Sequence, residues 1–221
     1  MSSTPDNILL RSRELWAQAF PEDKPEFLDL YFSRCYTAER NLTLTEENSD
    51  EIVAAGQILP LAFNFGGRRL SAGYVSGLVV DPASRGKGLG GRWMAEAHRR
   101  MHAEGQVLSL LIPDGDELRN WYAQGAHGAY DTVSHRFTIP LLEEGEPPRA
   151  GMPDITEEHE LSTELWRFYN TFGGRHPYEV RHDRDSLEVG IRSALIDGGQ
   201  LLVARRRRKI VGFCLAFAEP Y

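Results

Sequence analysis

The residues of this chain best suited to chemistry lie in one glycine-rich segment, Arg85-Gly86-Lys87-Gly88-Leu89-Gly90-Gly91. The segment follows an apolar run and precedes an amphipathic stretch, as expected for a turn between a strand and a helix. Successive backbone N–H groups in such a turn, with the unpaired donors of the helix start, form a concavity that binds phosphate oxygens. Glycine tolerates positive φ there, and Arg85 and Lys87 add positive charge. The pattern predicts a ligand with a phosphate or pyrophosphate group.

Two cofactors fit this turn. Gly86, Gly88 and Gly91 have the spacing of the dinucleotide fingerprint, and Asp114 follows roughly twenty residues later, as that fingerprint expects. A dinucleotide-binding fold, however, begins with this unit and places its first glycine almost directly after the strand. Here the residues 81–85 intervene, and about eighty residues precede the motif. An NAD(P)-binding oxidoreductase is therefore the less favoured interpretation.

The turn must be positioned by the elements around it, and hydrophobic periodicity predicts these elements. Before the turn we expect two helices, a strand hairpin, a glycine turn and a buried central strand: Ser12–Phe20, Phe27–Cys35, Asn41–Thr45, Glu51–Leu61, Gly66-Gly67 and Tyr74–Val80. After it we expect a helix with its core face at Trp93, Met94, Ala97 and Met101, then a strand, a short helix and a last strand: Val107–Ile112, Glu117–Gln124 and Ser134–Pro140.

With these elements in place, the segment Arg85-x-x-Gly88-x-Gly90 matches the pyrophosphate-binding motif of the GNAT acetyltransferases, Gln/Arg-x-x-Gly-x-Gly/Ala. The order of elements agrees with that family, and the strand end at Leu78–Pro82 resembles the segment that introduces its motif. The resemblance covers about residues 8–140. It implies an α/β fold of GNAT type, with a mixed, mostly antiparallel central sheet flanked by helices.

The resemblance also implies roles for individual residues. The central strand would separate from Val107–Ile112, and the backbone of Val79 and Val80 would bind pantetheine and polarise the thioester carbonyl. The pyrophosphate would be held by the backbone of the turn, with the cofactor-binding residues Arg85, Gly86, Lys87, Gly88, Leu89 and Gly90. Tyr122 would be the catalytic acid that protonates the departing thiolate, or else an aromatic packing residue. Ala126 and His127 stand where the family usually has a glycine and an aromatic residue.

The general base stays open at this stage. The attacking amine must lose a proton, often through a carboxylate, a histidine or a water held by one. Residues in the region expected to border the acceptor are Glu22, Asp23, Glu39, Tyr74 and Ser76. His98 and His102, on the helix after the turn, are expected to face solvent.

The C-terminal third resembles a second, incomplete copy of the same fold. A linker with Pro147-Pro148 separates a GNAT domain over residues 1–145 from a smaller α/β half-unit over residues 155–221, with two helices and a hairpin. Glu164-Leu165-Trp166 echoes Glu14-Leu15-Trp16, and Arg205–Lys209 is expected to be a solvated hairpin tip. The open edge of this hairpin could pack on the first domain or support a homodimer.

Composition narrows the class of protein. A net charge of −7 argues against a nucleic-acid partner. Cys35 and Cys214 lie far apart without metal-ligand spacing, so neither a disulfide framework nor a metal site is expected. The first residues do not resemble a signal peptide, and no window reaches the ~18 apolar residues of a membrane span. We therefore expect a cytoplasmic protein without a membrane partner.

These observations predict an N-acetyltransferase that moves an acetyl group from acetyl-CoA, as cosubstrate, to an amine of a small molecule or peptide. The amine would attack the thioester directly in a ternary complex. A non-catalytic acyl-CoA-binding sensor of the same fold is the alternative of another class. The residues do not identify the acceptor, because acceptor sites of this family are built from variable helices and loops.

Overall fold

The computed structural model of the chain describes residues 4–124, 130–131, 151–172 and 177–217. The elements before residue 125 are α1 (Pro5–Ala19), α2 (Pro25–Arg34), β1 (Asn41–Thr45), β2 (Ile52–Phe65), β3 (Arg68–Val80), the 3₁₀ turn η1 (Pro82–Ser84), α3 (Leu89–Ala103), β4 (Leu108–Leu110) and α4 (Gly115–Gln124). Those after residue 150 are β5 (Asp154–Glu158), α5 (Thr163–Phe172), β6 (Tyr178–Arg181), α6 (Arg184–Ile196), β7 (Gln200–Arg206) and β8 (Lys209–Ala216). The predicted strand at 134–140 and the positions 126 and 127 lie outside the described residues.

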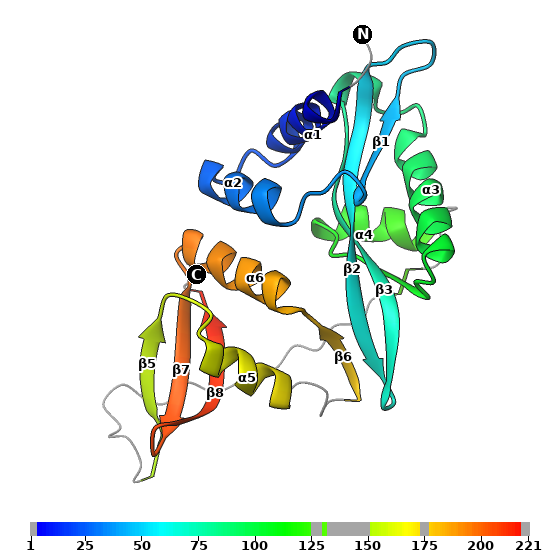
Figure 1. Cartoon of the computed structure of the whole chain (residues 1–221). Helices are drawn as coiled ribbons and strands as arrows, with labels where there is room; N and C mark the ends of the chain where they lie inside the picture. Colours follow the sequence, from blue (N-terminus) through cyan, green and yellow to red (C-terminus); the bar gives the residue numbers. More distant parts are fainter. Residues whose placement is uncertain (1–3, 125–129, 132–150, 173–176, 218–221) are drawn as a thin grey trace.

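The larger sheet has the strand order β1-β2-β3-β4, and β6 joins it by pairing with the far end of β2. Every pairing in it is antiparallel except that of β3 with β4, which is parallel. Helices α1 and α2 cover one face of this sheet and α3 covers the other (Figure 1). The mixed, mostly antiparallel sheet flanked by helices is thus confirmed, whereas a dinucleotide fold would need a parallel sheet.

Each face of the sheet has its own core. On the α3 side, the face formed by Trp93, Met94, Ala97 and Met101 is almost fully buried against β1, β2 and β3, as the helical spacing predicts. On the α1–α2 side, an aromatic cluster joins Trp16, Leu28, Tyr31 and Phe32. The sheet is therefore fixed from both sides, which is what a site made of backbone groups requires.

The hairpin of β2 and β3 is longer than hydrophobic periodicity indicates. Gly66 and Gly67 have φ of +54° and +82° and form the tight turn between the strands, the backbone conformation that favours glycine in two-residue hairpin loops. The ladder continues from this turn to the pair Ala54 and Val80. The last residues of β2, Ala62–Phe65, pair with β3 on one side and with β6 on the other. The pairing with β6 joins segments far apart in the sequence.

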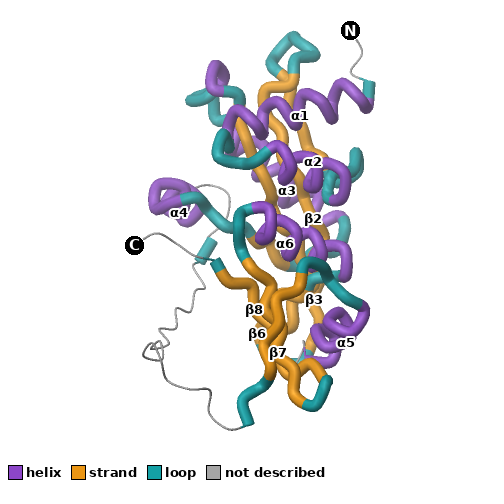
Figure 2. The backbone as a smooth tube through the Cα atoms, turned by 90° about the vertical axis from the view of Figure 1, so that its left-hand side faces the viewer, coloured by secondary structure: helices purple, strands orange, loops and turns teal. Residues whose placement is uncertain are grey.

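The smaller sheet has the order β5-β7-β8 and is covered by α5 and α6 around a core of Leu165, Ile191, Leu201 and Val203. The β7–β8 turn contains Arg207 and Arg208, both with positive φ, so a turn at the predicted hairpin tip is confirmed. Figure 2 shows α6 beside α2, with α1 beyond it, all on the same side of the long strands. The division into domains at 145 and 155 stays a prediction.

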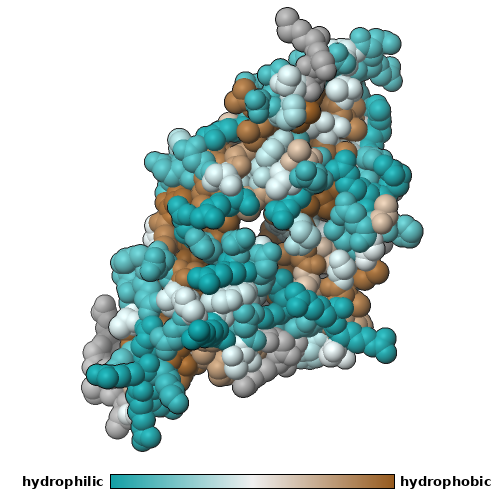
Figure 3. Space-filling view, in the orientation of Figure 1, coloured by the Kyte–Doolittle hydropathy of each residue, from teal (hydrophilic) through white to brown (hydrophobic). Residues whose placement is uncertain are grey.

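Polar contacts at both ends of α2 join it to α6. Arg34 lies 3.7 Å from the carboxylate of Glu188, and Lys24 donates to the carbonyl oxygen of Ile196 at the end of α6. A hollow opens near the middle of the surface, where this α2–α6 layer meets the long strands (Figure 3). Within the described residues, no helix has the length and apolar character needed to cross a membrane.

Candidate active site

The central strand β3 loses its neighbour part of the way along. Within the described residues, it pairs with β4 only from Ala72–Leu108 to Tyr74–Leu110, and then continues to Val80 with no strand hydrogen-bonded on that side. We predicted a strand over 107–112, but only Leu108–Leu110 is strand. The parallel pair therefore separates beyond Tyr74 and leaves a notch at the edge of β3.

A β-bulge marks the place where the strands separate. Ala55 pairs with Val79 and Gln57 with Ser76, so Gly77 and Leu78 together oppose the single residue Gly56. Gly77 has a φ of +60°, a conformation that side chains other than glycine rarely adopt. Bulges of this kind redirect the strand and the groups that it presents.

Two tryptophans hold the bulge from opposite faces. A Cβ atom at Gly77 would overlap the ring of Trp16, and one at Gly56 would lie 2.6 Å from the ring of Trp93. The indole N–H of Trp93 donates to the carbonyl oxygen of Leu42, at 2.8 Å. Both side chains are nearly fully buried, so the bulge has little freedom to move.

The bulge determines which backbone groups face the notch. The N–H of Asp81 donates to the carbonyl oxygen of Val53 at 2.8 Å, so the backbone of Asp81 points toward β2. Because alternate residues of an antiparallel ladder point to the same edge, Val79 also faces β2, and Leu78 and Val80 face the notch. The prediction named Val79 and Val80; the alternation favours Leu78 and Val80 instead.

Beyond β3, the glycine turn leads into α3. Gly86 and Gly88 have φ of +78° and +73°, and a Cβ atom at either would meet no atom within 4 Å. Gly88 is the N-cap of α3 and supplies no side-chain hydrogen bond to the helix start. Within the described residues, the first N–H groups of α3 are therefore available to a ligand, and the binding of an anion by them stays a prediction.

A cavity of about 420 Å³ lies against this turn. Its wall consists of Val80, Ser84, Arg85, Gly86, Gly88, Leu89, Gly90, Gly91 and Trp121. Small-molecule sites typically have volumes of about 300–1,000 Å³. Five of the predicted cofactor-binding residues in the turn line it, together with Val80 at the end of the notch strand.

The two cations of the turn point in different directions. The Nε atom of Arg85 donates to the carbonyl oxygen of Val80 at 3.3 Å, and its terminal nitrogens have no hydrogen-bond partner within the described part of the chain. The ammonium of Lys87 instead lies 2.8 Å from the carboxylate of Glu46, which raises the pKa of that lysine. Lys87 lines a separate cavity with Arg92. The expectation that its charge lies at the pyrophosphate site is therefore not met.

Tyr122 lies on α4 and is largely buried in the α3-side core, so it does pack as an aromatic core residue. Its ring contacts those of Trp121 and Tyr130. Burial, followed by the neighbouring tyrosines Tyr130 and Tyr74, raises the pKa of Tyr122 to about 12. The phenol therefore keeps its proton at neutral pH, which is a requirement for a general acid.

The residues considered for a general base differ in burial and in their hydrogen bonds. Ser76 accepts a buried hydrogen bond from the hydroxyl of Tyr31, at 2.8 Å. Asp23 accepts from the indole N–H of Trp16 at 2.6 Å, and burial raises its pKa. Both therefore lie beside the α1–α2 face of the bulge. Burial also raises the pKa of Tyr74. The side chains of Glu22 and Glu39 are exposed.

The expectation that His98 faces solvent is wrong. Its side chain is half-buried, and its Nε2 atom lies 2.9 Å from the hydroxyl of Tyr130. The hydroxyl of Tyr130 also contacts that of Ser109 on β4. The ring of Tyr130 packs on the ring of Tyr122, so the polar side chains of His98, Tyr130 and Ser109 form a group next to the predicted general acid. His102 is exposed, as expected.

Several residues of the site were not found from the sequence. Gly77 lies in the bulge and Trp16 packs against it, Ser84 and Trp121 line the cavity, and Arg11 of α1 bonds to Asp81 at the end of β3. Only Trp121 had a local signal, since it adjoins Tyr122 on a short helix. The others depend on contacts between distant segments, which no local pattern reports.

A mixed sheet that opens beside its central strand, with a glycine turn and helix start at the opening, is the architecture of an acetyltransferase of the GNAT class. The model of the Acetyltransferase (GNAT) domain family matches residues 6–119. The chain belongs to this family. No curated protein matches the chain.

Solved structures agree with this fold. A GCN5-related N-acetyltransferase from Anabaena variabilis superimposes with a TM-score of 0.67 at 14% identity, over 96% of this chain and 52% of that one. A probable N-acyltransferase from Enterococcus faecalis gives 0.65 at 13% identity, over 96% and 53%. A GCN5-related N-acetyltransferase from Kribbella flavida gives 0.58 at 17% identity, over 98% and 53%. The chain thus spans about half the length of each, and the likeness concerns the fold alone.

Proposed function

We propose that the protein transfers an acetyl group from acetyl-CoA to the amine of a small molecule or peptide in a ternary complex. The observation that supports this most directly is the continuity of two features at Val80. This residue ends the unpaired edge of β3 and also lines the cavity at the glycine turn. One extended ligand could then occupy both, with its pyrophosphate at the turn and its thioester in the notch.

The reaction first requires that the cofactor is held in place and that a hydrogen-bond donor is fixed at its thioester carbonyl. The N–H groups at the start of α3 and the terminal nitrogens of Arg85 would hold the pyrophosphate, since both are available and the helix dipole favours an anion there. The backbone groups of Leu78 and Val80 would bind the pantetheine amides and the thioester carbonyl. Proximity and a rigid oxyanion donor then lower the barrier without a special side chain.

The chemical step would be a direct attack. The neutral amine nitrogen forms a bond to the thioester carbon, the carbon–sulfur bond breaks, and the sulfur leaves as thiolate. Tyr122 would donate a proton to the thiolate, and the amine would lose one proton to a base or water. A thiol has a pKa of about 8.5, so the donor accelerates departure of the thiolate without being indispensable.

The amine would approach from the α1–α2 side of the bulge. Asp23 and the hydroxyl pair of Tyr31 and Ser76 lie on that side, and Figure 3 shows a hollow where the α2–α6 layer meets the long strands. Asp23 has the chemistry to accept a proton from the amine or to bind its ammonium form. The position of α6 against α2 makes the C-terminal part a candidate for acceptor selection.

The proposal is tested by combining binding and turnover. We expect acetyl-CoA to bind in titration calorimetry and free thiol to be released with at least one member of a broad panel of amines. Binding without thiol release from any amine would favour the non-catalytic sensor. Binding of NADH but not acetyl-CoA would refute the proposal and restore the dinucleotide interpretation.

A further inference from the structure

Arg11 of α1 bonds both to the start of β2 and to Asp81, the residue that follows β3. Its Nε atom donates to the carbonyl oxygen of Ile52 at the start of β2, at 3.2 Å. Its terminal nitrogen lies 2.6 Å from the carboxylate of Asp81, seventy residues later in the chain. The side chains of Arg11 and Asp81 are 24% and 19% exposed, so solvent screens this ion pair less than it would a surface pair.

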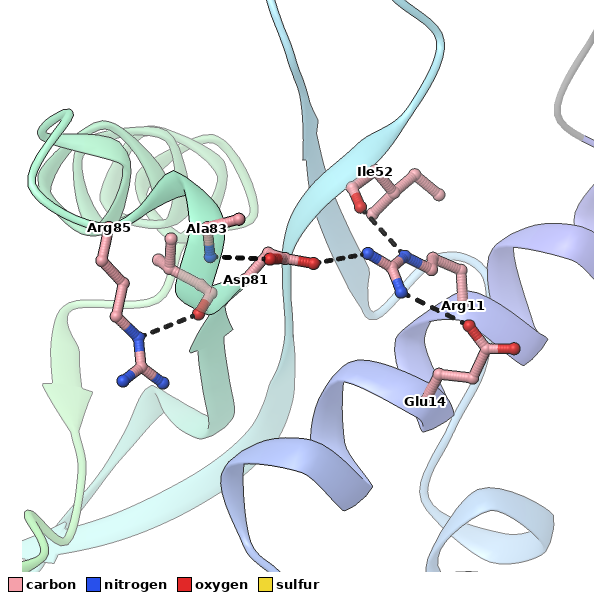
Figure 4. A network of polar contacts seen from close by, with 7 residues as sticks. Arg11, Glu14, Ile52, Asp81, Ala83 and Arg85 are labelled. Carbon is pink, nitrogen blue, oxygen red and sulfur yellow. Dashed lines mark hydrogen bonds and ion pairs between the residues drawn. The ribbon is translucent and has the colours of Figure 1, made fainter.

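Asp81 occupies the point where β3 ends and the glycine turn begins. Its N–H is bound to Val53 of β2, one carboxylate oxygen accepts from the N–H of Ala83 at 3.0 Å, and the other accepts from Arg11. The carboxylate therefore caps the turn η1 while α1 holds it in place. Figure 4 shows this chain of contacts from α1 through Asp81 to Ala83, with Arg85 bonded to the strand end beside it.

The glycine turn has few other restraints. Residues 85–88 are exposed, and no atom lies within 4 Å of a Cβ built at Gly86 or Gly88. Glycines with this freedom lose more backbone entropy on ordering than other residues. The backbone of the turn is thus held mainly at its two ends, the first turn of α3 and Asp81 with the cap η1, while the side chains of Arg85 and Lys87 bond to Val80 and Glu46.

We propose that Arg11 is a positioning residue for the pyrophosphate of acetyl-CoA, acting through Asp81 on the glycine turn. The proposal rests on the proposed function above. Arg11 does not line the cavity at the glycine turn. Its ion pair holds the start of the turn in the orientation that aims the N–H groups at the cavity, so the ligand need not order the turn on binding.

The experiment compares Arg11→Gln with Arg13→Gln, a matched control on the same helix. Arg13 also forms an ion pair at 2.6 Å, but with Asp29 of α2 and away from the turn. We would measure the dissociation constants of acetyl-CoA and of S-acetylpantetheine, which has the thioester but lacks the pyrophosphate. Arg11→Gln should weaken acetyl-CoA binding about tenfold, the effect of one misplaced charged hydrogen bond. It should leave S-acetylpantetheine within about twofold, and Arg13→Gln should change neither by more than that.

Two further variants guard against a general loss of folding. Asp81→Asn keeps an oxygen for the cap on Ala83 but removes the charge that holds Arg11, and it should reproduce the selective loss. Arg11→Lys should restore part of the acetyl-CoA affinity, because its ammonium can reach Asp81 without the second bond to Ile52.

The outcomes separate the two proposals. Wild-type affinity for acetyl-CoA in Arg11→Gln, or a parallel loss for both ligands, would overturn the positioning role while leaving the proposed function intact. If the wild-type protein itself bound neither thioester, the proposed function would fail before the variants were compared.

Discussion

Replacement of Gly88 by alanine separates the cost of a strained backbone from the cost of a damaged binding site. Gly88 has a φ of +73° and no atom within 4 Å of a built Cβ, so the substitution strains the backbone without a steric clash. Gly105, just after α3, has the same two properties, with a φ of +74°. Alanine in this conformation costs about 1–2 kcal/mol at either position. The two variants should therefore lose stability equally, by about 2–8 °C in Tm.

Their affinities for acetyl-CoA should differ. The helix α3 has 15 residues and is therefore about 22 Å long, with Gly88 before one end and Gly105 beyond the other. At Gly88 the new methyl group enters the space where phosphate oxygens would approach, and relief of the strain turns the N–H groups at the helix start away. Loss of one hydrogen bond to a charged group costs about 1.5–3 kcal/mol, which corresponds to a dissociation constant about ten- to a hundredfold higher.

Titration calorimetry with acetyl-CoA and thermal denaturation of both variants test this reasoning. We expect equal Tm shifts, a large loss of affinity for Gly88→Ala and unchanged affinity for Gly105→Ala. Wild-type affinity for acetyl-CoA in both variants would mean that the turn is a flexible linker and that the pyrophosphate binds elsewhere. Equal losses of affinity would instead indicate a general effect of stability.

Three further results are expected. Tyr122→Phe should lower kcat about tenfold or more while the dissociation constant of acetyl-CoA stays the same, and an unchanged kcat would leave Tyr122 as a packing residue. Because the pKa of Tyr122 is about 12, its ionisation should not lower the wild-type rate up to about pH 10. Lys87→Ala should raise the dissociation constant of acetyl-CoA less than Arg85→Ala, because the lysine is paired with Glu46; calorimetry showing the reverse order would place the lysine at the phosphate. For Asp23, whose raised pKa means that the folded state holds its proton at pH values where the unfolded chain has lost it, stability should fall as pH rises above the ordinary value of 3.8. Asp23→Asn, which can still accept from Trp16, should lose this part of the pH dependence of Tm, and parallel Tm profiles would contradict the raised pKa.

The parts of the fold that could be predicted from sequence are those with a local cause. The helical face of α3 follows from the spacing of Trp93, Met94, Ala97 and Met101, all of which are buried in the structure. The strand β1 was predicted with its observed bounds, Asn41–Thr45, because a polar turn limits it on one side. In both cases the signal and the structure lie within a few residues of each other, so a period or a turn residue suffices.

The parts that could not be predicted depend on contacts between distant segments. The end of β2 also pairs with β6, more than a hundred residues later, and no local pattern in β2 indicates this partner. Lys87 was expected at the anion site, but Glu46 of the β1–β2 turn draws its ammonium to the other side. Periodicity reports which face of an element is apolar and carries no information about such partners.

The candidate site shows why the glycine turn could be recognised from local sequence, whereas the separation of the central strand was expected only through the family resemblance and its bulge was not expected. Positive φ at Gly86 and Gly88 restricts these positions largely to glycine, so the conformation of the turn is indicated directly by the sequence. Gly77 is restricted in the same way, yet it stands alone in a strand, where one glycine has several explanations. Its function as a bulge depends on Trp16 and Trp93, which lie on separate helices and press on the two faces of the sheet. A backbone site of this kind is specified by the residues that immobilise it. Substitutions of Trp16 or Trp93 should therefore weaken binding of the thioester part of the ligand more than binding of its pyrophosphate.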